Sequence, residues 1–174
     1  MKYFDELARA MVWLGTKPRT LFLGQAVGYP GTAMFNTLRD VPADRRREFP
    51  VAEEFQLGVT TGLALQGFVP ISIFPRWNFL LLAVNQLVNH LDKLPLISDY
   101  RPKVIIRTGV GSVRPLDPQW QHKGDFTDAM QLMLKTVRVV RLDEPEQIVP
   151  AYQEAYEFEG STILCEVSDY INEK

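Results

Sequence analysis

Three clusters of side chains in this sequence combine groups that can transfer protons with rings that can stack on a planar ligand. They are the carboxylate pair Glu53–Glu54, the aromatic run at residues 74–79 and the segment at residues 119–122, which ends in His122. Carboxyl and imidazole groups are common proton carriers in enzymes near neutral pH. Each cluster also has a purely structural explanation, because carboxylates suit the first turn of a helix, aromatic rings pack in cores, and a loop histidine needs no role.

No self-contained catalytic motif accompanies these clusters. The sequence has no phosphate-binding loop ending in Gly-Lys-Ser/Thr and no paired Cys-x-x-Cys, and the Gly-Val-Gly-Ser run at residues 109–112 is too short for a dinucleotide fingerprint. Any chemistry therefore depends on how the fold brings the clusters together.

Hydrophobic periodicity predicts the elements that position them. Apolar residues at helical spacing predict helices at 4–14, 51–63, 79–94, 126–134 and 146–156, and short runs of strand formers predict strands at 20–23, 69–74, 104–107, 137–140 and 162–166. This alternation is typical of an α/β fold with a mostly parallel sheet and helices on both faces. Ligands of such sheets bind beyond the carboxyl ends of the strands, here residues 24–31, 74–79, 108–124 and those after 140.

The predicted helix at 51–63 carries two glycines, Gly58 and Gly62, on the same face as its apolar residues. Glycine costs about 1 kcal/mol relative to alanine inside a helix. We therefore expect another backbone to pack very close to this face.

Length, composition and charge exclude several classes of protein. A chain of 174 residues with 46% apolar and 23% charged residues predicts one folded domain over residues 1–174. Its 19 basic and 21 acidic residues give a net charge of -2, so nothing indicates nucleic-acid binding. No stretch approaches the roughly 18 apolar residues of a membrane span, and no signal peptide is evident. The single cysteine, Cys165, predicts a buried, unreactive thiol in a cytoplasmic protein.

Taken in order, these segments resemble the pyrimidine-binding domain of thiamine diphosphate enzymes in the transketolase superfamily. The closest likeness is to the β subunit of the 2-oxo acid dehydrogenase decarboxylase component. In the family pattern a glutamate opens a helix with glycines five and nine residues later, and Glu53 fits this spacing whereas Glu54 does not. The resemblance covers roughly residues 20–166, and its other matches are the aromatic residue Phe79, the pair Asn85-Gln86, the strand and glycine turn at 103–111, and the pair Gln121-His122.

The resemblance implies thiamine diphosphate as cofactor and Glu53 as the residue that activates it. In this family a carboxyl group bonded to the pyrimidine ring makes the cofactor's own amine basic enough to remove the thiazolium proton. We expect burial among Phe49, Val51 and Phe55 to raise the pKa of Glu53, against the effect of the helix N-terminus.

The same resemblance implies roles for three further residues. Phe79 would stack on the aminopyrimidine ring, and His122 would hydrogen-bond a substrate oxygen or move a proton. Gln25 stands in the cofactor-binding position where many β subunits carry glutamate, so the family's link between active sites through that residue is not expected here.

The sequence has no counterpart of the family's diphosphate-binding domain, whose Gly-Asp-Gly motif and downstream asparagine hold the diphosphate and Mg²⁺, or of its C-terminal domain. The resemblance therefore implies a pyrimidine-binding subunit that is inactive alone and pairs with a diphosphate-binding partner subunit in a heterotetramer.

The implied reaction is cleavage or formation of a carbon–carbon bond next to a carbonyl, by a transferase, oxidoreductase or lyase. A ketose phosphate and a 2-oxo acid are both open as substrates, and the loop at 114–120 follows no pattern that chooses between them. Two alternatives are a non-catalytic interaction or regulatory protein that retains the fold, which Gln25 favours, and an unrelated small-ligand module of flavodoxin-like architecture.

Overall fold

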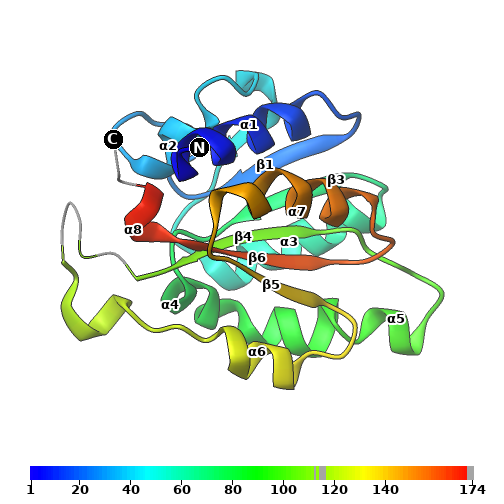
Figure 1. Ribbon diagram of the computed structural model, residues 1–174. Coiled ribbons are helices and arrows are strands. Elements are labelled where there is room, and N and C mark those ends of the chain that lie inside the picture. The colour runs from blue at the N-terminus through cyan, green and yellow to red at the C-terminus, as the bar shows by residue number, and fades with distance from the viewer. Residues whose placement is uncertain (112, 114–116, 172–174) are drawn as a thin grey trace.

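The computed structural model describes residues 1–111, 113 and 117–171, so residues 114–116 of the loop noted above lie outside the described residues. Six parallel strands form one sheet in the order β2-β1-β3-β4-β6-β5 (Figure 1). The strands are β1 (Thr20–Gly24), β2 (Arg46–Glu48), β3 (Val69–Ile73), β4 (Ile105–Val110), β5 (Arg138–Leu142) and β6 (Thr162–Val167).

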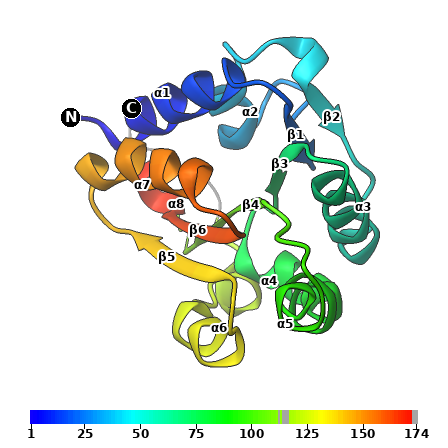
Figure 2. The same cartoon turned by 90° about the vertical axis from the view of Figure 1, so that its right-hand side faces the viewer.

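Helices cover both faces of the sheet, as Figure 2 shows. One face carries α1 (Tyr3–Gly15), α2 (Ala33–Leu38), α7 (Pro145–Glu157) and α8 (Ser168–Ile171). The other carries α3 (Glu53–Leu65), α4 (Trp77–Leu80), a π-helix (Gln86–Leu91) and α6 (Thr127–Met133). The short helix α5 (Leu94–Ile97) follows the π-helix in the chain. The predicted α/β class with a parallel sheet is confirmed.

Two buried clusters of apolar side chains, one on each face, form the core because strands covered on both sides must be apolar on both sides. On β4, Ile105 packs with α1 and α7, and its neighbour Ile106 packs on the opposite face. Cys165 of β6 is fully buried, as predicted, and its Sγ accepts a hydrogen bond of 2.8 Å from Trp77 Nε1. Burial raises the pKa of this thiol to about 11.

The structure differs from the predicted elements in two respects. The predicted helix at 79–94 is divided into α4, a 3₁₀ turn (Leu81–Ala83), the π-helix and α5, so its backbone is not regular. The short elements α2, β2 and α8 were not predicted. The three residues of β2 are all charged, and such an edge strand has no apolar period to reveal it.

The longest apolar helical segment among the described residues does not reach the length and hydropathy needed to cross a membrane.

A buried ion pair joins the two central strands β4 and β6 beneath α7. Arg107 and Glu166 are both 0% exposed, with 2.5 Å from Nε to Oε1 and 3.0 Å from Nη2 to Oε2. The hydroxyl of Thr37 in α2 accepts a hydrogen bond of 2.8 Å from Arg107 Nη1, and Tyr152 in α7 donates one of 2.6 Å to Glu166. Burial alone would lower the pKa of Arg107, but the adjacent Glu166 carboxylate raises it, so the guanidinium stays charged.

We expect Arg107→Met to destabilise the chain by about 3–5 kcal/mol, because Glu166 would be left as an unpaired buried charge. Urea denaturation followed by circular dichroism measures this cost. The double variant Arg107→Met/Glu166→Leu should lose less stability than the single variant, since no charge is left behind. A single variant as stable as the parent would contradict this account of the pair.

Candidate functional site

Glu53 lies at the first position of α3, at the carboxyl end of the sheet. Its side chain is 4% exposed, and its Oε1 accepts a hydrogen bond of 3.0 Å from Nε2 of Gln25, which directly follows β1. Gly24, the last residue of β1, has φ +152°, and a Cβ there would lie 2.3 Å from the carbonyl oxygen of Ile73 in β3. A side chain at this position would clash, so glycine allows the chain to turn toward Glu53.

The burial of Glu53 has a different origin from the one predicted. Val51 and Phe55, which we expected to surround it, are 76% and 58% exposed. Glu53 instead shares the inner face of α3 with Gln56 and Thr60, three and seven residues later. The side of α3 that faces the sheet therefore combines these polar side chains with Leu57 and Ala64 of the apolar core, while Phe55 points outward.

Hydrogen bonds hold this polar face against β3. Gln56 Nε2 donates to Ser72 Oγ at 3.2 Å and to the carbonyl of Ile73 at 3.0 Å, and Thr60 Oγ1 donates to Ser72 Oγ at 3.0 Å. These contacts fix the rotation of α3 about its axis, and with it the inward direction of Glu53. Glu54 is on the outer side, exposed, where its Oε1 accepts a hydrogen bond of 3.1 Å from Asn85.

Glu48 holds the loop that carries Gln25, a role that the sequence did not reveal. Its carboxylate accepts hydrogen bonds from three successive backbone amides, those of Ala26 (2.7 Å), Val27 (2.9 Å) and Gly28 (2.7 Å). The next residue, Phe49, donates from its amide to the carbonyl of Gly24 at 2.8 Å. The only sequence signal was an acidic residue directly after the basic run at 45–47, which is too general to indicate this contact.

Phe79 and His122 form the second pair that the structure brings together. Phe79 lies in α4, after β3, and His122 ends a 3₁₀ turn (Gln119–His122) in the segment after β4. Their rings stack with centroids 5.1 Å apart and an angle of 24° between the planes. The Nδ1 of His122 is buried without a hydrogen-bond partner. The neighbouring Gln121 is exposed, and Trp120 of the same segment is 94% exposed.

The two pairs lie at the ends of neighbouring strands, since β1 is hydrogen-bonded to β3. No hydrogen bond or ring contact joins Gln25 or Glu53 to Phe79 or His122 among the described residues. The arrangement offers a buried carboxylate whose Oε2 has no hydrogen bond within the described part of the chain, an aromatic ring and an imidazole. No group of three or more His, Cys, Asp or Glu residues in residues 1–111, 113 and 117–171 is placed to hold a metal ion.

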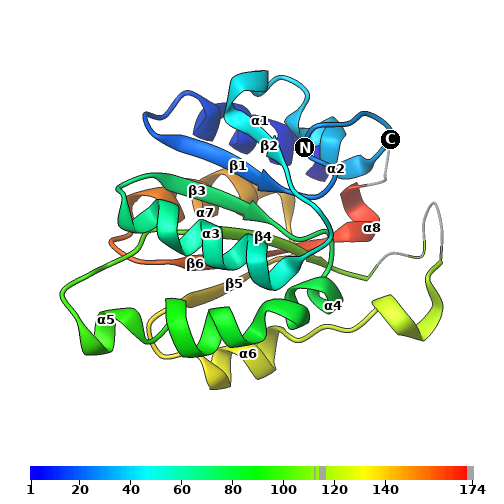
Figure 3. The ribbon, with the colours of Figure 1, turned by 180° about the vertical axis from the view of Figure 1, so that it is seen from behind.

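The glycines of α3, where we expect a close backbone contact, have none within the described part of this chain, so the expected contact stays a prediction about another subunit. A Cβ on Gly58 would be 3.8 Å from the Gln86 side chain, an ordinary contact, and a Cβ on Gly62 would meet nothing within 4 Å. No backbone of this chain packs closely on them within the described residues. Figure 3 shows α3 on the outside of the sheet.

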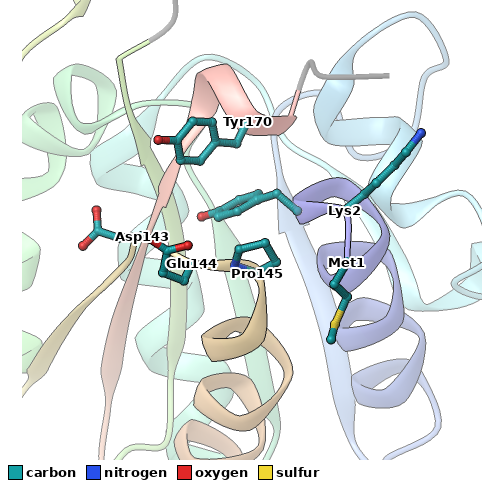
Figure 4. Close-up of a pocket in the computed structure, with 7 residues that line it drawn as sticks. Met1, Lys2, Asp143, Glu144, Pro145 and Tyr170 are labelled. Carbon is teal, nitrogen blue, oxygen red and sulfur yellow. The ribbon is translucent and has the colours of Figure 1, made fainter.

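A cavity of about 310 Å³ lies elsewhere, between the first turn of α1, the start of α7 and α8 (Figure 4). Its lining includes Tyr170, Asp143 and Glu144. Both carboxylates are engaged, because Asp143 accepts a hydrogen bond of 2.7 Å from Arg141 and Glu144 caps α7. The cavity contains none of the predicted site residues.

We expect Glu48→Gln to loosen the loop that carries Gln25. An amide group offers one acceptor oxygen where the carboxylate offers two, so amide exchange at residues 26–28 should speed up about 10-fold or more. Hydrogen–deuterium exchange with mass spectrometry measures this change. Glu159→Gln, which alters an exposed carboxylate paired only with Lys103, is the control. Unchanged exchange at 26–28 would show that Glu48 does not hold the loop.

Comparisons with known proteins place the fold. No family model matches the sequence, and no curated protein matches it. Among solved structures, the chain is similar to a split-gene transketolase described as an inactive β4 tetramer, with a TM-score of 0.74 and 18% identity over 95% of this chain and 50% of that chain. The chain thus spans about half the length of the structure that it matches. Its fold is transketolase-like.

Proposed function

We propose that this chain is the pyrimidine-binding subunit of a split thiamine diphosphate enzyme. The observation that carries the proposal is the Glu53 carboxylate, buried at the start of α3, with one oxygen bonded to Gln25 and the other unpartnered among the described residues. The ordered motifs and the transketolase-like fold support the same conclusion. A closer relation to the 2-oxo acid dehydrogenase β subunits rests on the sequence pattern alone.

The residues fit the cofactor's pyrimidine ring. Glu53 offers an unpartnered carboxylate oxygen at which to share a proton with a ring nitrogen, and Gln25 orients that carboxylate through the other oxygen. Phe79, half-buried, supplies an aromatic surface, although His122 stacks on its ring. When bound, thiamine diphosphate supplies the electron sink for cleaving or forming a carbon–carbon bond next to a carbonyl. The unpartnered Nδ1 of His122 is suited to hold or move a proton at the substrate.

A partner subunit would hold the diphosphate and Mg²⁺, for which this sequence carries no Gly-Asp-Gly motif. The outward face of α3 is the surface we assign to assembly, because Val51 and Phe55 are exposed there and Gly62 has room for another backbone. A heterotetramer with two chains of each kind suits this arrangement, and the matched structure is itself a tetramer of a split-gene transketolase. The free, buried Cys165 is in keeping with a cytoplasmic enzyme.

A second candidate is a non-catalytic interaction protein that retains the fold. Gln25 favours it, because an amide cannot exchange a proton with Glu53 as a second carboxyl group could. The two functions differ in what the Glu53 carboxylate does.

We expect Glu53→Gln, in the complex with the diphosphate-binding chain, to lower turnover by about 100-fold or more, the lower part of the range for positioned proton transfer. The amide keeps the size of the side chain but cannot exchange the proton. Deuterium exchange at the cofactor's thiazolium carbon, followed by NMR, should slow in the same variant.

Glu54→Gln is the matched control, since Glu54 is the next residue on the same helical turn and is exposed. It should leave turnover and exchange at the parental rates. If Glu53→Gln behaves like Glu54→Gln in both measurements, the catalytic function is wrong and the non-catalytic alternative is favoured.

We expect Phe55→Ser to weaken assembly with the partner subunit about 10-fold or more, because an exposed aromatic side chain would be lost from the first turn of α3. The stability of the isolated chain should change by only about 0.5 kcal/mol, since Phe55 is largely exposed. Sedimentation velocity measures the assembly. Leu132→Ser on α6, where Leu132 is 80% exposed, should assemble like the parent. Equal assembly by both variants would place the interface elsewhere.

A further inference from the structure

Arg76 differs from every other arginine that the structure describes. The other described arginine side chains donate a hydrogen bond or lie in an ion pair; Arg107 contacts Glu166, Arg45 the carbonyl of Thr20, and Arg46 the carbonyl of Val27. Within the described residues the Arg76 guanidinium has neither kind of contact, yet the residue is partly buried. No Arg76 nitrogen is among the described side-chain atoms that are buried without a partner, so the N–H donors of its guanidinium are open to a ligand.

The backbone places Arg76 at the carboxyl end of the sheet, next to the candidate site. It lies three residues after β3, and its carbonyl oxygen accepts hydrogen bonds from the amides of Phe79 (3.0 Å) and Leu80 (3.3 Å). Arg76 is therefore fixed at the first turn of α4, which also carries Phe79. Its position is set by the fold rather than by contacts of its side chain.

The strand ends around Arg76 are closely packed. β4 lies between β3 and β6, and a Cβ on Gly109 of β4 would lie 2.5 Å from Ser168 Oγ and 3.5 Å from the carbonyl oxygen of Pro75. The segments that follow β3 and β6 thus converge over the end of β4. Arg76 belongs to the first of these segments and Asp169 to the second.

Asp169 does not form an ion pair with Arg76. Its Oδ1 accepts a hydrogen bond of 2.6 Å from the amide of Val113, and no contact within 4 Å joins it to the guanidinium. Burial lowers the pKa of Arg76, and the more distant charge of Asp169 offsets this only in part. The positive charge of Arg76 is therefore not neutralised by a direct partner in this part of the chain.

Three further polar atoms at the same end of the sheet are buried without a hydrogen-bond partner among the described residues. They are Asn78 Oδ1 on α4, Thr108 Oγ1 on β4 and His122 Nδ1. Thr108 is 0% exposed. Buried polar atoms in native proteins nearly always have partners, so three of them at the end of the sheet that also carries an unpaired arginine indicate a place for a polar ligand.

We propose that Arg76 binds the anionic group of the substrate, a carboxylate or a phosphate. The inference rests on the proposed function and assigns a residue of this chain to the negative charge that both candidate substrates carry. A planar guanidinium matches the paired oxygens of either group with two parallel hydrogen bonds. Bound in this way, the anion would orient the substrate toward the segment that carries Phe79 and His122.

Titrations of the purified full-length chain with sodium pyruvate and with inorganic phosphate test the proposal. The ionic strength is matched with sodium chloride, and binding is followed by NMR at the arginine Nε–Hε signals, with Arg76 assigned from its loss in Arg76→Lys. Pyruvate stands for a 2-oxo acid and inorganic phosphate for a sugar phosphate. We expect the Arg76 signal to shift and then saturate as at least one of the two anions is added. The anion that binds more tightly identifies whether the site takes a carboxylate or a phosphate.

Arg76→Gln should weaken binding of that anion about 10-fold or more, because a charge-assisted bidentate contact is lost. Arg76→Lys should bind with intermediate affinity, since it keeps the charge and loses the planar fork. Arg39→Gln is the matched control, because Arg39 is an exposed arginine beside Asp40. Without anion, Arg76→Gln should melt at the parental temperature or above it, whereas a structural role for Arg76 would lower the melting temperature.

Absence of saturable binding of either anion to the parent would overturn the proposal, and so would undiminished binding to Arg76→Gln. The result is independent of the test of Glu53. Anion binding through Arg76 in a chain whose Glu53→Gln variant keeps full turnover would refute the proposed catalysis and retain the anion site. Loss of turnover in Glu53→Gln without anion binding would refute the anion site alone.

Discussion

The ion pair between Arg107 and Glu166 constrains the centre of this molecule more than any other described contact. Two charges at 0% exposure are tolerated only when their donors and acceptors are satisfied by the protein. Thr37 and Tyr152 meet that requirement, so α2 and α7 must approach the sheet where these side chains reach the pair. The strands β4 and β6 are thereby held in register directly below the end of the sheet that carries the candidate site.

A second polar contact, between α3 and β3, sets the direction of the proposed catalytic carboxylate. Hydrophobic contacts alone would allow the helix to rotate about its axis, whereas the hydrogen bonds of Gln56 and Thr60 to β3 form in only one orientation of the helix. The same orientation buries Glu53 and leaves Glu54 in water. Polar packing inside the chain thus places two adjacent glutamates in different environments, one buried and one exposed, although both are the same residue type.

The sequence predicts the general architecture because period-2 and period-3.6 patterns are local. It predicts the parallel α/β fold and the edge of the sheet at which the polar clusters lie. The choice of Glu53 rather than Glu54 comes from the resemblance to the family pattern, in which glycines follow the glutamate at the spacing of Gly58 and Gly62. It does not predict β2 or the role of Glu48, because three charged residues at an edge carry no apolar period. It predicts close packing on the glycine face of α3, and the structure leaves that face uncovered within the described residues, as a contact between subunits requires. The partners of Arg107 are a matter of long-range geometry, although an arginine and a glutamate inside two apolar strands are a signal for a buried pair.

The outward apolar face of α3 has a consequence for how such a chain is handled in solution and in a cell. The inner side of α3 is held by hydrogen bonds and by the buried Leu57 and Ala64, whereas Phe55 and Val51, just before the helix, stay in contact with water. Exposed apolar surface of this kind drives association with any complementary surface, including that of identical copies. If the proposed partner covers this surface, solubility depends on stoichiometry, because an excess of this chain would leave the surface exposed and favour precipitation over assembly.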